Sequence, residues 1–426
     1  MRVLVVGGGG REHALVWKLS QSPEVSKIFC APGNAGIASL AECVPVEQED
    51  IEGLQRFAQD NEVHLTVVGP EAPLVEGITD LFNANGQLVF GPTRSGARLE
   101  GSKSWARRFM KRYGLPTAEF AVFEEPQEAY RYLDNSDYPL VIKADGLAAG
   151  KGVVVAENPR QARETVKLFM EDEIFGEAGK TIVIEECLEG EELSSFAVTD
   201  GKTLLPLTTA QDHKPIYEGD RGPNTGGMGS YSPAFLLTPE MWEEINEKIY
   251  EPLLKGLWEE EIFYRGIIYG GLIATQKGIK LLEFNVRFGD PETQAVLPRL
   301  ESDLFPLLYE AARGNLSSLS MPEWKAEASV CVVMASQGYP GSYEKGKEIT
   351  GLEKAAEVAD THVFHAGTKF DNEKIETAGG RVLGLTAWDP YLENAINKAY
   401  SLTELIHFEG AYYRRDIAQA ALKKEK

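Results

Sequence analysis

The chain has 426 residues, of which 43% are hydrophobic and 25% charged, and its formal net charge at neutral pH is −22. This length predicts about two to four domains. The composition excludes a disordered chain, a collagen-like fibre and a small disulfide scaffold. Because so acidic a surface repels nucleic-acid phosphate, we expect no nucleic-acid partner. A bound nucleotide would need a local cluster of cations and backbone N–H groups.

The sequence contains no apolar run near the ~18 residues that a membrane helix needs. The apolar stretch Val3–Val6 is too short for a secretory signal. The four cysteines lie far apart, without a C-x-x-C pair or the spacing of a zinc site. We therefore expect a cytoplasmic protein with reduced thiols and no membrane partner.

The first of three segments, residues 1–101, alternates strands with helices. The apolar run Arg2–Val6 predicts a strand that ends in Gly7–Gly10 and is followed by an apolar-periodic helix. Further strands are expected at Lys27–Ala31 and His64–Gly69, each running into a loop with glycine and proline. The alternation predicts a parallel α/β sheet, and ligands bind such sheets at the carboxyl ends of the strands.

The second segment, residues 102–322, opens with a basic amphipathic helix, Lys103–Tyr113, that ends at Gly114. Residues 210–233 show little periodicity and are dense in Gly, Pro, Asp and Asn, which is typical of a long functional loop. The strand-like runs of this segment are Pro139–Lys143, Gly152–Ala156, Thr181–Glu185, Gly266–Thr275 and Lys280–Phe284.

The third segment, residues 323–426, predicts a small α+β domain. Strand-like runs occur at Ser329–Ala335, His362–Ala366 and Arg381–Ala387. Asp389 followed by Pro390 is typical of a helix start, with an N-cap residue and proline at the first helical position.

Two glycine-rich motifs invite nucleotide-binding interpretations that their spacing does not support. In Gly7–Gly10, the third glycine of a dinucleotide fingerprint is replaced by Glu12 or His13. The loop is either a packing turn or a site for a phosphate or carboxylate at a helix N-terminus. In Gly146–Gly152 the glycines are too close for a Walker A motif. With Lys151 beside it, this loop is either a cover for a triphosphate or a solvated hairpin.

An apolar strand runs into an acidic turn at Thr181–Glu192. A solvated acidic face is one interpretation. The other is a hinge that holds adenine, with a carboxylate accepting hydrogen bonds from ribose.

The most specific chemistry lies in the stretch Leu282–Thr293. Strand alternation places Glu283, Asn285 and Arg287 on one face. Two hard oxygen donors beside a cation suit Mg²⁺–phosphate. The alternative is an edge strand with one polar side.

Together these motifs resemble the ATP-grasp ligases. The motifs are K-A-D-G-L-A-A-G-K-G (Lys143–Gly152), V-I-E-E-C-L-E-G-E-E (Val183–Glu192), G-P-N-T-G-G-M-G (Gly222–Gly229) and E-F-N-V-R-F-G-D-P-E-T (Glu283–Thr293). Three more narrow the resemblance to the glycinamide ribonucleotide synthetase family, over essentially the whole chain. They are G-G-R-E-H-A-L (Gly9–Leu15), A-P-G-N-A-G (Ala31–Gly36) and V-G-P-E-A-P-L (Val68–Leu74).

The resemblance implies an N-terminal parallel α/β domain at 1–101 and a central ATP-grasp domain at 102–322. It places a mobile lid lobe at about 116–190 and a small C-terminal α+β domain at 323–426. The implied reaction joins glycine to 5-phosphoribosylamine in de novo purine biosynthesis. It gives glycinamide ribonucleotide, ADP and phosphate through glycyl phosphate. The implied cofactors are ATP and Mg²⁺ or Mn²⁺, the partners are these small molecules alone, and we expect a monomer.

The resemblance also implies roles for residues of this chain. By this resemblance, the catalytic residues would be Arg287, Asp212 and Asp290, and the metal ligands would be Glu283 and Asn285. The cofactor-binding residues are Lys103, Lys143, Gly150, Lys151, Gly152, Glu185, Glu186, Leu188 and Glu192. The substrate-binding residues are Gly9, Gly10, Arg11, Glu12, Gly33, Asn34, Gly69, Pro70, Glu71, Asn224, Gly226, Gly227, Pro291 and Thr293.

Two other functions stay open at this point. The chain could be a different ATP-dependent carboxylate–amine ligase, which the acid that triggers ADP formation would reveal. It could also be a nucleotide sensor without catalysis, which would bind ATP without turnover. The intact Glu283 and Asn285 argue against the sensor.

Overall fold

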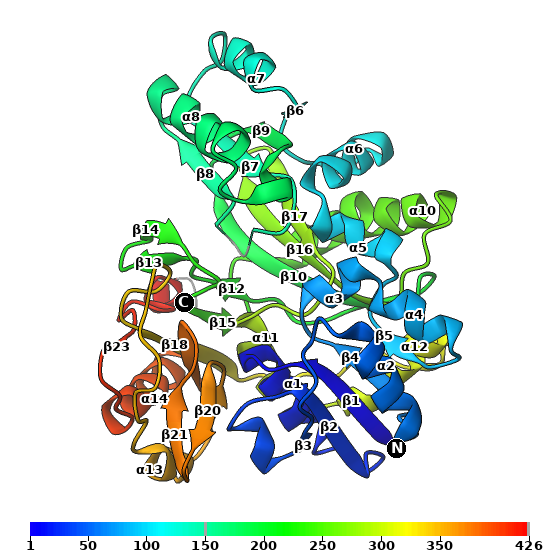
Figure 1. The fold of residues 1–426 in the computed structure, drawn as a ribbon, viewed down its shortest axis with the longest axis vertical. Helices are drawn as coiled ribbons and strands as arrows, with labels where there is room; N and C mark the ends of the chain where they lie inside the picture. Colours follow the sequence, from blue (N-terminus) through cyan, green and yellow to red (C-terminus); the bar gives the residue numbers. More distant parts are fainter. Residues whose placement is uncertain (149–150, 424–426) are drawn as a thin grey trace.

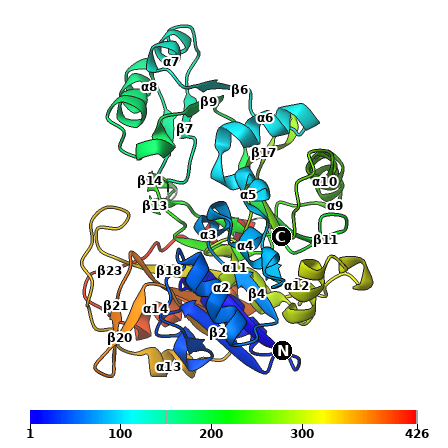
Figure 2. The ribbon, with the colours of Figure 1, turned by 45° about the vertical axis from the view of Figure 1, so that its right-hand side comes forward.

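The structure is a computed structural model that describes residues 1–148 and 151–423, so Gly150, an expected cofactor-binding residue, lies outside the described residues. Figure 1 shows the N-terminal segment in blue and the C-terminal segment in orange and red, side by side at the bottom. A lobe coloured cyan to green stands at the top, and the turned view of Figure 2 shows the same separation.

The N-terminal segment is built on a five-stranded parallel sheet with the order β3-β2-β1-β4-β5, which confirms the predicted α/β class. Leu4 and Val6 pack into one core cluster, and Val3 and Val5 into another, so both faces of β1 are buried. Its strands are β1 (Arg2–Gly7), β2 (Lys27–Pro32), β3 (Glu42–Cys43), β4 (Leu65–Val68) and β5 (Val89–Phe90). Its helices are α1 (Gly10–Leu19), α2 (Ile51–Asp60), α3 (Glu71–Glu76), α4 (Ile78–Ala84) and α5 (Arg94–Gly101).

The central segment contains two antiparallel four-stranded sheets, β6-β9-β7-β8 and β11-β10-β16-β17. The first sheet forms the lobe of Figure 1 together with α7 and α8. The strands of the lobe are β6 (Phe120–Phe123), β7 (Leu140–Ala144), β8 (Val153–Ala156) and β9 (Ile182–Glu186), and its helices are α7 (Pro126–Leu133) and α8 (Pro159–Val166). The second sheet contains β10 (Glu191–Thr199), β11 (Leu204–Pro206), β16 (Gly266–Thr275) and β17 (Gly278–Asn285).

Local sequence signals set the ends of the helix that opens this segment. The predicted helix is α6 (Lys103–Tyr113), with the bounds that the sequence indicates. The side chain of Ser102 caps its start, and Gly114 ends it with a φ of 71°. Further helices are α9 (Pro239–Ile245), α10 (Glu251–Glu259), α11 (Glu292–Val296) and α12 (Leu304–Arg313).

The C-terminal sheet has the order β12-β15-β18-β22-β19, and β23 also pairs with β18. Two of its strands come from residues 210–233, which the sequence predicts to be a loop. This prediction is wrong, because β15 pairs with a strand about a hundred residues away (Gly229↔Val332) and β12 in turn pairs with β15, so these strands show no local periodicity. The strands from this stretch are β12 (Gln211–Asp212), β13 (Pro215–Tyr217), β14 (Arg221–Asn224) and β15 (Gly229–Ser232).

The predicted helix start at Asp389–Pro390 is also wrong, since α14 (Leu392–Leu405) begins later. Asp389 still pairs with Ala328 and so belongs to the preceding strand. The other elements of this segment are β18 (Ala328–Ser336), α13 (Leu352–Ala356), β19 (Thr361–His365), β20 (Thr368–Asp371), β21 (Lys374–Thr377), β22 (Arg381–Asp389) and β23 (Ala411–Tyr412). Short 3₁₀ or π turns lie at Ile37–Ser39, Lys167–Glu171, Gly176–Gly179, Asn246–Tyr250, Leu297–Arg299, Leu316–Ser318 and Gln419–Lys423.

The N-terminal sheet and the central sheet share their cores. Leu4 of β1 belongs to the same buried cluster as Leu281 and Phe284 of β17, and Val5 to the same cluster as Phe288. This shared core brings the carboxyl ends of β1 and β4 beside the end of β17. Within the part of the chain that is described, no helix has both the length and the apolar character to cross a membrane.

The Gly7–Gly10 loop packs closely against the loop that follows β2. A Cβ on Gly8 would lie 2.5 Å from the carbonyl oxygen of Gly33. The N–H of Gly9 donates to the Glu12 carboxylate at 2.6 Å, so the protein itself supplies the anion at this helix start. Only glycine lets the loops after β1 and β2 approach so closely.

We expect Gly8→Ala to lower the free energy of unfolding by about 1–3 kcal/mol, because its methyl group meets a backbone carbonyl that cannot move aside. Gly9→Ala is the matched control. Its Cβ would meet the ends of the Glu12 and Asp290 side chains, which can shift. Chemical denaturation of both variants measures the difference, and equal losses would show that the two loops separate easily.

Candidate active site

The expected ligand-binding residues meet where the N-terminal sheet faces the end of β17. Arg287 Nε lies 3.3 Å from Glu71 Oε2, at the start of α3. Arg11 Nη1, in the first turn of α1, donates to the carbonyl of Phe288 at 3.2 Å. Residues far apart in the sequence therefore form one site.

Lys143 is anchored by a buried carboxylate between the lobe and α6. Its Nζ lies 2.9 Å from Glu185 Oε2, and Arg107 binds both oxygens of the same carboxylate, at 2.5 and 2.7 Å. Burial lowers the pKa of Lys143, and the Glu185 charge opposes that effect. The Glu185 side chain is thus engaged by cations, and its backbone lies in β9 between β6 and β7. Arg107 is missed by the sequence analysis, because it is one of several basic residues on an amphipathic helix.

Lys103 lies at the start of α6, next to the strand end of β7. Its Nζ donates to the Gly146 carbonyl at 3.3 Å, and its N–H donates to the Asp145 carbonyl at 3.0 Å. The Asp145 carboxylate accepts hydrogen bonds from Ser102 and from the N–H of Ser104. Lys103 and Lys143 are therefore held by two sets of contacts, each of which includes residues of α6.

Lys214 forms a second cationic centre that the sequence analysis misses, although it lies in a stretch marked as functional. Its Nζ is 3.2 Å from Glu192 Oε2 and 3.7 Å from Asp212 Oδ1. Burial alone lowers the pKa of Lys214, but these carboxylates raise it well above its ordinary value. Burial also raises the pKa of Asp212. Lys214 thus joins two expected site residues, Glu192 of β10 and Asp212 of β12.

Glu283 and Asn285, near the end of β17, offer the oxygen donors that a hard divalent cation prefers. Burial raises the pKa of Glu283, yet the charges of the surrounding lysines, Lys214 first, lower it overall and keep the carboxylate anionic. Among residues 1–148 and 151–423, no group of three or more His, Cys, Asp or Glu could hold a metal ion. The donor set fits a cation that completes its coordination with phosphate oxygens or water, as Mg²⁺ does.

Arg287 is held between two carboxylates. Its Nη2 lies 2.8 Å from Glu100 Oε1, and its Nε is the partner of Glu71. Nη2 also donates to Asn285 Oδ1 at 2.9 Å. Burial raises the pKa of Glu100 to about 7. Glu100 is missed by the sequence analysis, since nothing near it in the sequence indicates a ligand.

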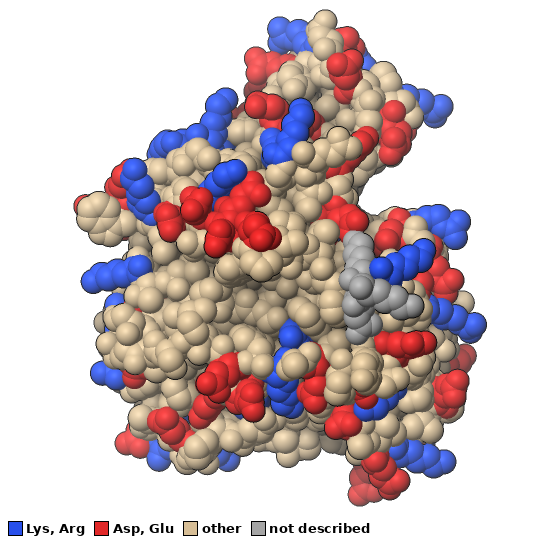
Figure 3. All heavy atoms as spheres, turned by 180° about the vertical axis from the view of Figure 1, so that it is seen from behind, with Lys and Arg blue, Asp and Glu red and all other residues tan. Residues whose placement is uncertain are grey.

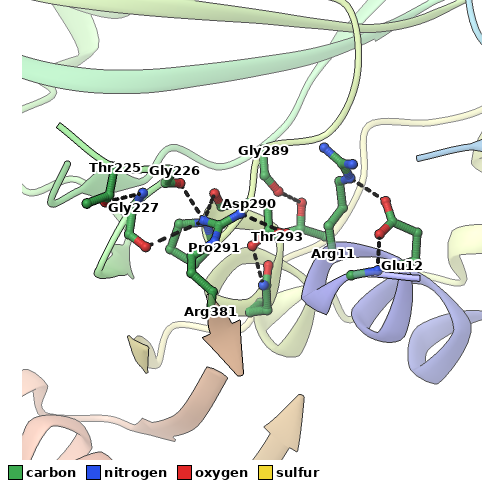
Figure 4. A network of polar contacts seen from close by, with 12 residues as sticks. Arg11, Glu12, Thr225, Gly226, Gly227, Gly289, Asp290, Pro291, Thr293 and Arg381 are labelled. Carbon is green, nitrogen blue, oxygen red and sulfur yellow. Dashed lines mark hydrogen bonds and ion pairs between the residues drawn. The ribbon is translucent and has the colours of Figure 1, made fainter. Parts of the chain in front are cut away.

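The loop before α11 is tied to the Gly226–Gly227 turn by Arg381, as Figure 4 shows. Arg381 donates to the carbonyls of Gly226 and Asp290, and its Nη2 lies 3.4 Å from Asp290 Oδ2. Arg381 opens β22, in a predicted strand-like run to which the sequence analysis assigns no functional role.

Several expected substrate-binding residues are engaged within the protein. Asn34 Nδ2 donates to the carbonyls of Gly8 and His365, and its Oδ1 accepts from the N–H groups of Gly36 and Ile37. Glu12 is 2% exposed and pairs with Arg11 Nε at 2.5 Å. A Cβ on Gly69 would lie 2.0 Å from Glu12 Oε1. These side chains shape the loops, and a ligand there would meet mainly backbone.

The remaining expected residues lie around the same centre or at the lobe. Thr293 Oγ1 donates to the Gly289 carbonyl at 2.5 Å, and Pro291 accepts a hydrogen bond from Ser230 at 2.8 Å. Glu186 accepts from the N–H of Glu119 at the edge of the lobe. Asn224 ends β14, Leu188 follows β9, Gly10 begins α1, Pro70 precedes α3, and Lys151 and Gly152 precede β8.

The net negative charge is distributed over the outer surface. Figure 3 shows Asp and Glu side chains, with Lys and Arg between them, over the face opposite that of Figure 1. By contrast, the side chains of Arg107 and Lys143 are at most 8% exposed. The cations of the site are thus kept apart from the acidic surface.

Comparisons with known proteins agree with this arrangement. Three family models match the chain in order, all described as phosphoribosylglycinamide synthetase: the N domain at residues 1–100, the ATP-grasp (A) domain at 101–293 and the C domain at 329–420. A phosphoribosylamine–glycine ligase from Caldanaerobacter subterraneus is 50% identical over 98% of this chain and 99% of its own. One from Escherichia coli O6:H1 is 48% identical over 100% of both.

Solved structures share the fold. The crystal structure of a phosphoribosylamine–glycine ligase from Thermotoga maritima has a TM-score of 0.86 at 37% identity, covering 98% of this chain and 100% of that one. A biotin carboxylase from Campylobacter jejuni has a TM-score of 0.75 at 13% identity, over 99% of this chain and 95% of its own, which shows a common fold.

The fold and the site define an ATP-grasp ligase. Since the family models and the relatives span nearly the whole chain, it belongs to the phosphoribosylglycinamide synthetase family.

The raised pKa of Glu100 predicts a pH dependence of stability. Since its pKa is about 7 in the folded protein and 4.5 ordinarily, the folded state binds the proton more tightly, and stability falls as pH rises between these values. In Glu100→Gln this fall should be reduced by about 1–3 kcal/mol between pH 5 and 8. Urea denaturation across that range measures it. Glu76→Gln, an exposed carboxylate nearby, is the control. Parallel pH profiles for the wild type and Glu100→Gln would refute the assignment.

Proposed function

We propose that this protein joins glycine to 5-phosphoribosylamine with cleavage of ATP, yielding glycinamide ribonucleotide, ADP and phosphate in de novo purine biosynthesis. The observation that carries the proposal is the contact between Arg287 and Glu71. It sets the end of β17, with its oxygen donors, beside the loop after β4. Membership in the synthetase family supports the choice of substrates.

The chemistry explains why such a site needs cations and a closed volume. A carboxylate is a poor acyl donor, because its leaving group would be oxide. An oxygen of glycine bonds to the γ-phosphorus of ATP while the bond to ADP breaks, forming glycyl phosphate. The amine of phosphoribosylamine then attacks the carbonyl carbon, and phosphate leaves as the amine loses a proton. The substrates and intermediates are anionic, so their charge must be neutralised, and glycyl phosphate must be kept from water.

The positively charged side chains of the site suit the first step, the transfer of phosphate from ATP to glycine. Lys103 and Lys143 bind the ATP phosphates, and Arg287 acts on the transferring phosphate once it exchanges its carboxylate partners for phosphate. Glu283 and Asn285 hold Mg²⁺ or Mn²⁺, which neutralises phosphate charge when bound. The loop of residues 146–152 and the lobe of residues 116–190 close over the nucleotide and exclude water. Gly150, Lys151 and Gly152 belong to this loop.

The remaining expected residues bind the rest of the nucleotide and the other substrates. The backbone of Glu185, Glu186 and Leu188 holds adenine, and Glu192 accepts from ribose. Asp212, Asp290, and the segments 224–227 and 291–293 shape the glycine and acyl-phosphate subsite. The loops at Gly9–Glu12, Gly33–Asn34 and Gly69–Glu71 hold the phosphoribosylamine.

We propose further that the protein works as a monomer in the cytoplasm, with the central domain at 102–322 between domains at 1–101 and 323–426. The four cysteines are free thiols, which agrees with a reducing compartment. The site described here is built from one chain.

ADP release with Mg·ATP tests the reaction, with glycine and phosphoribosylamine supplied together and each then omitted. We expect turnover only with both. Glu283→Gln should lower the rate by more than about 100-fold, because it removes a charged metal ligand. Glu259→Gln, on the exposed end of α10, is the matched control. Turnover with another acid would indicate a different ligase, and ATP binding without any turnover would indicate a sensor.

Lys143→Ala should raise the KM for ATP far more than the KM for glycine. Its loss leaves Glu185 paired with Arg107, so the fold should survive. Lys180→Ala, an exposed lysine of the same lobe that pairs with Glu177, controls for a change in lobe charge. Steady-state kinetics with each substrate varied measures the ratio, and equal rises for both substrates would mean that Lys143 is structural.

A further inference from the structure

The backbone N–H and carbonyl groups of Gly226 are both held by side chains of the C-terminal segment. Tyr339, just after β18, accepts a hydrogen bond from the Gly226 N–H at 3.1 Å through its hydroxyl group. Arg381, at the start of β22, donates to the Gly226 carbonyl from the other side. A turn that carries expected glycine-binding residues is therefore held by side chains 113 and 155 residues further along the chain.

Arg381 also fastens the turn to the loop at Asp290. Figure 4 shows the guanidinium between the two segments. Its Nη1 donates to the Asp290 carbonyl at 2.8 Å and lies 3.5 Å from the Gly227 carbonyl, and its Nη2 faces the Asp290 carboxylate. Lysine has no planar fork and cannot satisfy several acceptors in this way.

The turn is closely packed on both sides. A Cβ on Gly226 would lie 2.9 Å from Arg381 Cζ. Gly227 has a φ of 112°, and a Cβ there would lie 2.4 Å from Pro291 Cδ. The turn thus lies between Arg381 and Pro291, and Gly227 in particular requires glycine, because its φ is positive and a Cβ there would overlap Pro291.

Asp290, the partner of Arg381, is also held in place by the protein. Asp290 Oδ1 accepts from Gln294 Nε2 at 2.8 Å, and Gln294 is 2% exposed. Burial raises the pKa of Asp290, but the charges of Arg381 and Arg11 lower it overall, so the carboxylate stays charged. Arg381 therefore pairs with an anion that is itself fixed to α1 and α11.

We propose that Arg381 and Tyr339 are positioning residues that set the geometry of the glycine subsite from the C-terminal domain. This proposal rests on the proposed function, because it takes the segments 224–227 and 290–293 as the glycine subsite. Arg381 acts through the turn and through Asp290, and it fixes the distance between the two walls of the subsite. Glycine is too small to hold that geometry by its own contacts.

Arg381→Gln tests the proposal. We expect kcat/KM for glycine to fall about 10- to 100-fold, because a small misplacement of a reacting group has an effect of that size. The KM for ATP should stay within about twofold, since Lys103 and Lys143 are held by separate contacts. Arg381→Lys should recover part of the loss through its charge.

Arg265→Gln is the matched control. Arg265 Nη1 donates to the carbonyl of Ala312 at 2.7 Å, so the variant also loses an arginine–carbonyl hydrogen bond, but away from the turn. Its glycine kinetics should equal those of the wild type. Tyr339→Phe keeps the ring and removes the hydroxyl group, and should raise the glycine KM in the same direction. Combined with Arg381→Gln, its effect should be less than additive, since both side chains hold one turn.

The outcomes separate the two proposals. Wild-type ADP release that does not depend on glycine would overturn the proposed function. Glycine-dependent release with an unchanged kcat/KM for glycine in Arg381→Gln would overturn the positioning role alone. Equal losses for ATP and glycine in that variant would also overturn it, because they would indicate general unfolding. Thermal denaturation of each variant checks this last case.

Discussion

The Arg287 guanidinium lies between the carboxylates of Glu71 and Glu100, with Nη2 2.8 Å from Glu100 and Nε 3.3 Å from Glu71. This contact joins the end of β17 to the N-terminal sheet, and the function of the protein depends on that junction. On one side lie the oxygen donors Glu283 and Asn285, and on the other lie the loops that follow β1, β2 and β4. A ligase must hold two substrates in reach of each other, and this junction is where the two halves of the site meet.

A strongly acidic protein that binds anions must keep its cations in place before the ligand arrives. Here each cation of the site is fixed by carboxylates or carbonyls of the protein. Lys143 is fixed by Glu185, Lys214 by Glu192 and Asp212, and Arg381 by Asp290. Fixed charges need no reorganisation when charge moves in the reaction, which is the main source of electrostatic catalysis. The same pairing explains why Arg107 and Glu185 tolerate burial.

Local sequence patterns predicted many of the helices and strands, because interactions between residues close in the sequence set where these elements begin and end. The capped helix Lys103–Tyr113 and the strand Gly266–Thr275 have the bounds that the sequence indicates. The short strands within residues 211–232 escaped detection, because β15 pairs with β18 about a hundred residues further along the chain and the other three strands are only two to four residues long. The helix expected at Asp389 begins later, since pairing with Ala328 keeps Asp389 in a strand. The pairing of Asp389 with Ala328 in the sheet outweighed the local preference of Asp389 and Pro390 for starting a helix.

The sequence by itself determined the class of the protein and the strand that carries its oxygen donors, because those features are written in contiguous motifs such as Glu283–Thr293. Only the tertiary structure decided which side chains face them. Glu100, Arg107 and Arg381 carry no local signal of a ligand, and Lys214 is not distinguished from its neighbours within a long stretch expected to be functional. Each reaches the site through a contact with a residue distant in the sequence. Such contacts depend on how the sheets pack against one another. The packing is set by cores shared between distant segments and has no period along the chain.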